Sequence, residues 1–123
     1  MVLSELVAYT HSGETPDAVG WVNGRCILVE AKTTRSDFFA DRKKMARLPD
    51  KNALGHWRFY LTPPGLLRAE ELPEGWGLYE VHGKTVRHAG GHMYRNAAPA
   101  PFQSCRDSEV ALLVSALARR DIS

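Results

Sequence analysis

The chain has 123 residues, of which 44% are hydrophobic and 24% are charged, and its formal net charge is +2. This length suits one compact domain, and the composition is ordinary for a soluble globular protein. No apolar run approaches the roughly 18 residues that a membrane-spanning helix needs, so we expect no membrane partner. The net charge alone is too small to identify a nucleic-acid-binding protein. We therefore expect a single domain over residues 1–123.

The N-terminal residues and the cysteines indicate the cellular compartment. The stretch MVLSELVAYTHSG contains no basic segment followed by an apolar core, so no secretory signal is expected. Cys26 and Cys105 lie far apart and outside any CxxC pattern, which favours two reduced thiols over a disulfide. Both observations predict a cytoplasmic protein.

The N-terminal part of the chain is predicted to hold three strands. Residues 3–9 form the first, and residues 18–22 and 25–31 form two more on either side of Asn23-Gly24. Asn-Gly is the dipeptide that most readily adopts the positive φ angles of a tight hairpin turn. The pattern therefore predicts a β-hairpin.

After this hairpin the pattern changes from strand to helix and back. Residues 36–45 are predicted to form a helix that Ser36 or Thr34 caps, with two phenylalanines on its apolar side. Residues 56–62, HWRFYLT, predict a strand that ends at two prolines. A strand, a helix and a further strand in succession are typical of a mixed α/β fold.

The C-terminal part is predicted to hold a second hairpin and a second helix. The expected elements are strands at 77–82 and 85–88 about Gly83, a Gly-rich and Ala-rich loop at 88–102, and a helix at 108–120 with Ser108 or Asp107 as its cap. The order of strands, helix, strands and helix predicts an α/β domain.

A group of charged residues stands at the end of an otherwise apolar strand. Side chains alternate along a strand, so Glu30 and Lys32 are expected on one face and Ala31 on the other. Asp17 opens the neighbouring strand of the same hairpin, which would bring its carboxylate toward that of Glu30. Two converging carboxylates repel unless a cation lies between them. The pattern therefore indicates a divalent metal site.

The metal that suits such a site is Mg²⁺, which prefers oxygen ligands and typically uses one or two carboxylates with water and substrate phosphate. The candidate ligands are Asp17, Glu30 and the carbonyl group of Ala31. Lys32 would then lie near the bound water and a phosphate oxygen. The alternative is a surface ion pair between Glu30 and Lys32, with Asp17 as a turn residue. Spacing alone leaves both interpretations open.

A basic cluster follows this strand. The stretch RSDFFADRKKMAR contains Arg35, Arg42, Lys43 and Lys44. These side chains form either a solvated helix face or a surface that contacts the phosphates of a nucleic acid. They are the candidate nucleic-acid-binding residues.

The charged residues also resemble the motif of a known family. Pro16-Asp17, a glycine-containing hairpin and then Glu30-Ala31-Lys32 after an apolar strand look like the PD-(D/E)XK nuclease superfamily. The stretches ILVEAKTTRSDFFADRKK and ELPEGWGLYEVHGK are also similar to small phage and bacterial nuclease-like proteins of this superfamily. The resemblance covers roughly residues 15–84, more than half the chain.

The resemblance implies a restriction-endonuclease-like mixed β-sheet flanked by helices. It also implies Mg²⁺ binding by two carboxylates, with Mn²⁺ as a substitute, and hydrolysis of phosphodiester bonds. Carried over to this sequence, Asp17 and Glu30 become metal ligands and Lys32 becomes the catalytic lysine.

One departure from the superfamily pattern concerns the N-terminus. Members usually begin with a helix that often carries another active-site glutamate, whereas this chain is predicted to begin in a strand. Glu5, the only acidic residue before Glu14, is either that additional acidic residue or a solvent-exposed side chain. Without the helix part of the sheet would be uncovered, so a homodimer is a further expectation.

The sequence thus predicts a cytoplasmic Mg²⁺-dependent deoxyribonuclease that cuts DNA internally, with Asp17, Glu30 and Lys32 as its catalytic residues. The alternative is a nuclease fold without cleavage activity that binds DNA or a partner protein in conflict between phage and host. The intact trio favours the enzyme, and the missing N-terminal helix favours the alternative. A purely structural protein has little support.

Overall fold

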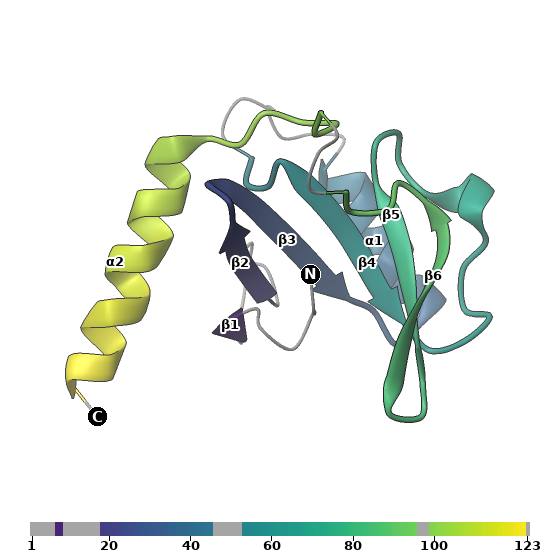
Figure 1. Cartoon of the computed structure of the whole chain (residues 1–123). Helices are drawn as coiled ribbons and strands as arrows, with labels where there is room; N and C mark the ends of the chain where they lie inside the picture. Colours follow the sequence, from purple (N-terminus) through teal and green to yellow (C-terminus); the bar gives the residue numbers. More distant parts are fainter. Residues whose placement is uncertain (1–6, 9–17, 46–52, 96–98, 123) are drawn as a thin grey trace.

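A mixed β-sheet and two α-helices make up the described part of the protein (Figure 1). The computed structural model describes residues 7–8, 18–45, 53–95 and 99–122. The strands are β1 (Val7–Ala8), β2 (Ala18–Val22), β3 (Arg25–Ala31), β4 (Trp57–Thr62), β5 (Gly77–His82) and β6 (Thr85–Gly91). The helices are α1 (Arg35–Met45), the short 3₁₀ helix η3 (Ala69–Glu71) and α2 (Arg106–Ile122). The predicted mixed α/β class is confirmed.

The strands lie in the sheet in the order in which they occur in the chain, from β1 to β6. β4 pairs in parallel with both β3 and β5, and the other pairs are antiparallel. Helix α1 connects β3 to β4, because a parallel pair needs a crossover that returns the chain to its starting end. The carboxyl ends of β3, β4 and β5 therefore lie at one end of the sheet (Figure 1).

The hairpin predicted at Asn23-Gly24 is confirmed. Asn23 has a φ of 51° and Gly24 a φ of 76°, as a tight two-residue turn requires. The register pairs Ala18 of β2 with Val29 of β3. The start of β2 and the end of β3 are therefore side by side.

Apolar side chains fill both faces of the sheet. The cluster beneath α1 consists of Leu28, Phe38, Tyr60, Leu67, Trp76 and Leu78. The cluster on the opposite face consists of Ile27, Val29, Trp57 and Phe59. Strand β3 is thus buried on both faces, which explains its continuous apolar run. Because side chains alternate along the strand, Glu30 shares the α1 face with Leu28.

Helix α1 is capped by Thr34 and anchored by one phenylalanine. The Thr34 hydroxyl accepts the backbone N–H of Asp37 at 3.2 Å, and the helix begins one residue earlier than predicted, at Arg35. Phe38 is fully buried, and its ring meets the ring of Tyr60 edge to face. Phe39 is 38% exposed, so Phe38 fixes the helix to the sheet.

The loop predicted at residues 88–102 is wrong in its first part, because β6 continues to Gly91. The glycines that suggested a loop allow close packing instead. A Cβ atom on Gly90 would lie 2.6 Å from the Cβ of Ala69, and one on Gly91 would lie 2.3 Å from the carbonyl oxygen of Trp76. Only glycine leaves room for these neighbours, so a strand continues where composition indicated a turn.

The cap predicted for the last helix is also wrong. Helix α2 begins at Arg106, so Asp107 and Ser108 lie within its first turn. The backbone N–H of Glu109 bonds to the carbonyl oxygen of Cys105 at 3.0 Å. Hydrogen bonds from Ser108 lower the pKa of the Cys105 thiol, so the sulfur acts as an acceptor at the helix start. Both cysteines of the chain are free thiols.

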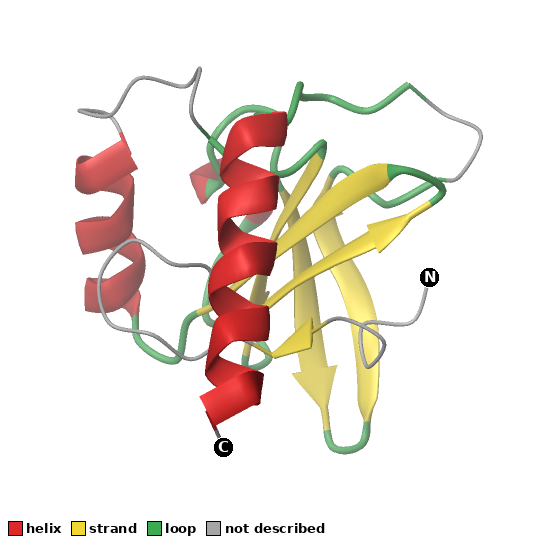
Figure 2. Ribbon diagram, turned by 90° about the vertical axis from the view of Figure 1, so that its left-hand side faces the viewer, coloured by secondary structure: helices red, strands yellow, loops and turns green. Residues whose placement is uncertain are grey.

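Helix α2 lies beside β2, away from β6 (Figures 1 and 2). The carboxylate of Glu109 is 1% exposed and accepts the indole N–H of Trp21 on β2. Arg106 pairs with the same carboxylate oxygen at 3.1 Å. A buried carboxylate thus fixes the start of α2 to the sheet. Neither α2 nor any other helix in the described ranges has the length and apolarity to cross a membrane.

Candidate active site

Glu30 and Lys32 lie where β3 leaves the core of the protein. The strand is buried from Cys26 to Val29, but Glu30 is half-buried and Ala31 is exposed. The backbone N–H of Lys32 donates to the carbonyl oxygen of Leu61 on β4 at 3.0 Å. The backbone therefore stays attached to the sheet through Lys32, and both charged side chains start from a fixed position.

Three side chains from three elements meet next to Glu30. The ammonium of Lys32 lies 3.7 Å from one carboxylate oxygen of Asp41 on α1. The hydroxyl of Tyr60 on β4 donates a hydrogen bond to the other carboxylate oxygen at 3.1 Å. Tyr60 is also the register partner of Glu30 on β3. We term Lys32, Asp41 and Tyr60 the lysine cluster.

The carboxylates of Asp41 and Glu30 both influence the hydroxyl of Tyr60. Burial raises its pKa, and the carboxylates of Asp41 and Glu30 raise it further. The hydroxyl therefore keeps its proton at neutral pH and acts as a donor. The carboxylates of Asp41 and Glu30 thus act on one buried hydroxyl, and the guanidinium group of Arg42 acts on it in the opposite direction.

The described part of this site contains two oxygen donors of the kind that Mg²⁺ binds. In the described ranges no three His, Cys, Asp or Glu side chains are grouped to hold a metal. Mg²⁺ needs fewer protein ligands, because water and substrate phosphate complete its coordination. Glu30 and the Ala31 carbonyl are oxygen donors of the right kind. Asp17 and Glu5 lie outside the described residues, so their roles stay predictions.

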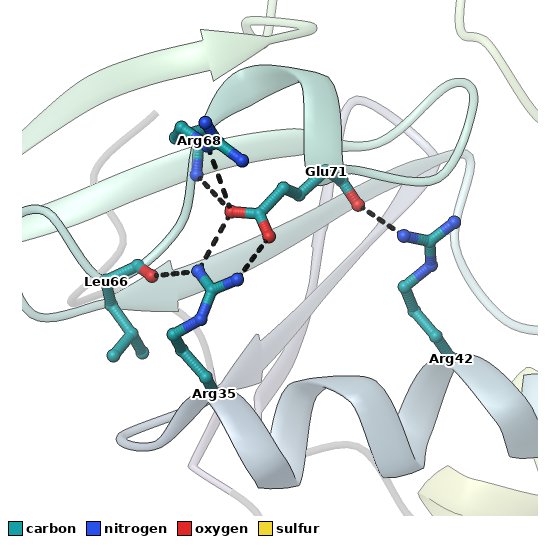
Figure 3. Close-up of polar contacts among 5 residues, drawn as sticks. All are labelled: Arg35, Arg42, Leu66, Arg68 and Glu71. Atoms are coloured by element: carbon teal, nitrogen blue, oxygen red, sulfur yellow. Dashed lines mark hydrogen bonds and ion pairs between the residues drawn. The ribbon is translucent and has the colours of Figure 1, made fainter.

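The candidate nucleic-acid-binding residues Arg35 and Arg42 make contacts within the protein (Figure 3). The guanidinium group of Arg35 donates to both carboxylate oxygens of Glu71, at 3.0 and 2.6 Å. It also donates to the carbonyl oxygen of Leu66 at 3.0 Å. Arg42 donates to the backbone carbonyl oxygen of Glu71 at 2.8 Å. We term Arg35, Arg42 and Glu71 the arginine clamp, which ties α1 to η3.

The clamp changes which basic residues a nucleic acid would meet. Arg35 and Arg42 already donate hydrogen bonds within the protein, so fewer of their N–H groups remain for a phosphate. Lys43 is exposed on α1, and the side chain of Lys44 lies outside the described residues. The contacts predicted between DNA and Lys43 and Lys44 stay a prediction.

The arginine clamp is expected to make stability depend on pH. Hydrogen bonds from Arg35 and from the backbone of Arg68 lower the pKa of Glu71 from 4.5 to about 2. The clamp therefore stabilises the fold fully above pH 4.5, and this contribution is lost as the pH falls toward 2. Glu71→Gln should lower the melting temperature by a few degrees at pH 7 and by progressively less below pH 4.5.

Melting curves recorded between pH 7 and pH 2 measure this effect. Glu70→Gln is the matched control, because it removes the same charge from the neighbouring exposed position of η3. A destabilisation by Glu71→Gln that stays constant across the acid range would contradict the prediction.

Reasoning from the sequence missed Asp41 and Tyr60. Asp41 follows Phe38 by three positions, and such residues share a helix face. A helical projection that places Phe38 on the buried side of the helix therefore also places Asp41 on the side that faces the sheet. Tyr60 was part of a predicted strand, but its position next to Glu30 depends on the parallel register of β3 with β4.

Comparisons with known proteins establish a similarity of fold. No family model and no curated protein matches the chain. The SPO1766 protein of unknown function from Silicibacter pomeroyi has a similar structure, with a TM-score of 0.56 over 89% of this chain and 70% of that chain. The two sequences are 24% identical, so the similarity concerns the fold alone.

Proposed function

We propose that the protein is a metal-dependent endonuclease that hydrolyses phosphodiester bonds in DNA. The observation that carries this proposal is the position of Glu30 and Lys32 at the carboxyl end of β3, where Asp41 holds the lysine in a mostly buried contact. The carboxylate of Glu30, as a metal ligand, and the ammonium of Lys32, as a partner for a phosphate, thus lie close together. The resemblance of residues 16–17 and 30–32 to the PD-(D/E)XK motif supports the same function.

The residues of the site have distinct roles in this proposal. Glu30, Asp17 and the Ala31 carbonyl would hold Mg²⁺, or Mn²⁺ in its place, which supplies Lewis acidity at the scissile phosphate. Lys32 orients the attacking water and stabilises the negative charge that develops on the phosphate oxygen. In this proposal the water attacks phosphorus in line with the scissile bond and gives up a proton to the solvent. The phosphorus–oxygen bond to the sugar breaks, and the leaving sugar oxygen takes up a proton from the solvent.

A cleavage assay on circular and branched DNA tests the proposed function. Supercoiled circles should become nicked or linear with Mg²⁺ and stay intact with EDTA in its place. Binding to the same DNA without cleavage in Mg²⁺ or Mn²⁺ would contradict the proposal. It would support the alternative, a nuclease fold that binds DNA without cutting it.

Lys43 and Lys44 are expected to contact the DNA backbone, because they follow Asp41, which contacts Lys32, by two and three positions in α1. Replacing either lysine with alanine should weaken binding similarly for all DNA sequences. The slope of log affinity against log salt should decrease by about 0.9, the contribution of one phosphate contact. Fluorescence anisotropy over a range of salt concentrations, without Mg²⁺, measures this slope.

The control for this experiment is Lys84→Ala. It removes the same charge from the exposed turn between β5 and β6, so it separates a local contact from a loss of net charge. Unchanged slopes for both α1 variants would place the DNA-binding surface elsewhere on the protein.

A further inference from the structure

A carboxylate outside the sequence motif contacts the motif lysine. Asp41 lies with one carboxylate oxygen 3.7 Å from the ammonium of Lys32, and its other oxygen accepts the hydroxyl of Tyr60 at 3.1 Å. The side chains of Lys32 and Asp41 are only 15% and 20% exposed. Residues from the end of β3, from β4 and from α1 therefore meet at one point, mostly shielded from water.

Lys32 benefits from such a partner because its ammonium ends a flexible four-carbon chain. A fixed carboxylate restricts the position of the ammonium before the substrate binds. Less entropy is then lost when the ammonium takes up its position for the reaction. An ammonium has three N–H donors, so one carboxylate leaves donors for a water and a phosphate oxygen. The contact with Asp41 thus restricts Lys32 and leaves it able to act.

Asp41 is itself held from two sides. The ring of Tyr60 is fully buried and stacks on Trp76 at a centroid distance of 4.5 Å, so the hydroxyl that binds Asp41 has a fixed position. The helix that carries Asp41 is fixed by the buried ring of Phe38 and by the arginine clamp. A mobile surface carboxylate would have neither support.

We infer that Asp41 is a positioning residue for Lys32, with Tyr60 as its support. The inference rests on the function proposed above. Asp41 acts through the lysine, whose ammonium it holds beside the attacking water and the phosphate. Without Asp41 the ammonium remains present but mobile. The chemical step should therefore slow down, whereas DNA should bind as before.

Steady-state kinetics with Asp41→Asn separate these two effects. The variant is expected to lower kcat by about 10-fold to 100-fold, the range typical of residues that support a catalytic group, with KM unchanged. Asp37→Asn is the matched control, because it removes the same charge from an exposed position one turn earlier in α1. It should retain the kinetics of the wild-type protein.

Two further variants define the interaction and cover the case in which Asp41→Asn fails to fold. Asp41→Glu keeps the carboxylate and should recover part of the lost rate. Tyr60→Phe keeps the buried ring and removes only the hydroxyl, so it should lower kcat by a smaller factor in the same direction.

A second measurement uses the metal-free protein and does not depend on cleavage. Lys32→Met, Asp41→Asn and the double variant are compared by thermal melting. If Lys32 and Asp41 interact in solution, the double variant should be less destabilised than the sum of the single variants. Additive shifts would overturn the inference, because the contact would then contribute nothing.

The kinetic outcomes separate this inference from the proposed function. If the wild-type protein cleaves DNA and Asp41→Asn retains its kcat, the positioning role is overturned and the proposed function stands. A loss of affinity as large as the loss of kcat would make Asp41 a DNA-binding residue and would also overturn the inference. If the wild-type protein cleaves no DNA with Mg²⁺ or Mn²⁺, the proposed function and the positioning role are both overturned.

Discussion

Glu30→Gln is expected to abolish Mg²⁺-dependent DNA cleavage, with a loss of at least about a hundredfold in kcat. The substitution removes the charge of a candidate metal ligand, and a neutral amide is a poor ligand for a hard cation. The side chain keeps its size at a half-buried position at the end of β3, so the core is not disturbed. Cleavage rates and melting curves from the same preparation measure both effects.

The control for this experiment is Glu74→Gln, which removes the same charge from an exposed position before β5. It should retain both the cleavage rate and the melting temperature. Asp17→Asn is expected to abolish cleavage as Glu30→Gln does. A variant of either residue that cuts DNA at the wild-type rate would exclude that residue from the site.

Phe38→Ala is expected to lower the free energy of unfolding by about 3–5 kcal/mol, because it leaves a cavity between α1 and the sheet. Phe38 is fully buried in the cluster that contains Leu28 and Tyr60. The loss is large for a domain of this size, whose total stability is typically about 5–15 kcal/mol. Chemical denaturation with urea measures it.

Phe39→Ala is a matched control, because Phe39 is the next residue and is 38% exposed. Its replacement should cost less than about 1 kcal/mol, as is usual for surface positions. Equal losses for the two variants would contradict the packing of α1 described above. Since α1 carries Asp41, Phe38→Ala should also reduce cleavage by the protein that remains folded.

Much of the fold could be predicted because its signals are local. Asn23-Gly24 determines a turn through its own φ preferences, and the apolar run that follows it is typical of a strand buried on both faces. The cap of α2 was misplaced within the first turn of the helix, a local error, whereas the error in β6 arose because distant residues decide the outcome. Gly90 and Gly91 were interpreted as a loop, but the close approach of Ala69 and Trp76 explains them.

The candidate site could be predicted only for those of its residues that are close together in the sequence. Glu30 lies in β3 and Lys32 directly follows this strand, so alternation places both on one face. Asp41 and Tyr60 come from other elements, and only the crossover of α1 and the parallel register of β4 bring them to Lys32. The role predicted for Arg35 illustrates the same limit, because its partner Glu71 lies on a different element.

The order of the strands has a consequence for synthesis on the ribosome. Every strand of the sheet pairs with the strand that precedes it in the chain, so pairing can proceed as the chain emerges. Of the two parallel pairs, β3 with β4 waits longer, because α1 and the residues after it must be made before β4 can reach the edge of β3. During that interval the apolar run from Cys26 to Val29 lies on the open edge strand of a small sheet, in which β2 is the main partner and β1 adds only two residues. We expect nascent chains that end before β4 to be the most prone to aggregation.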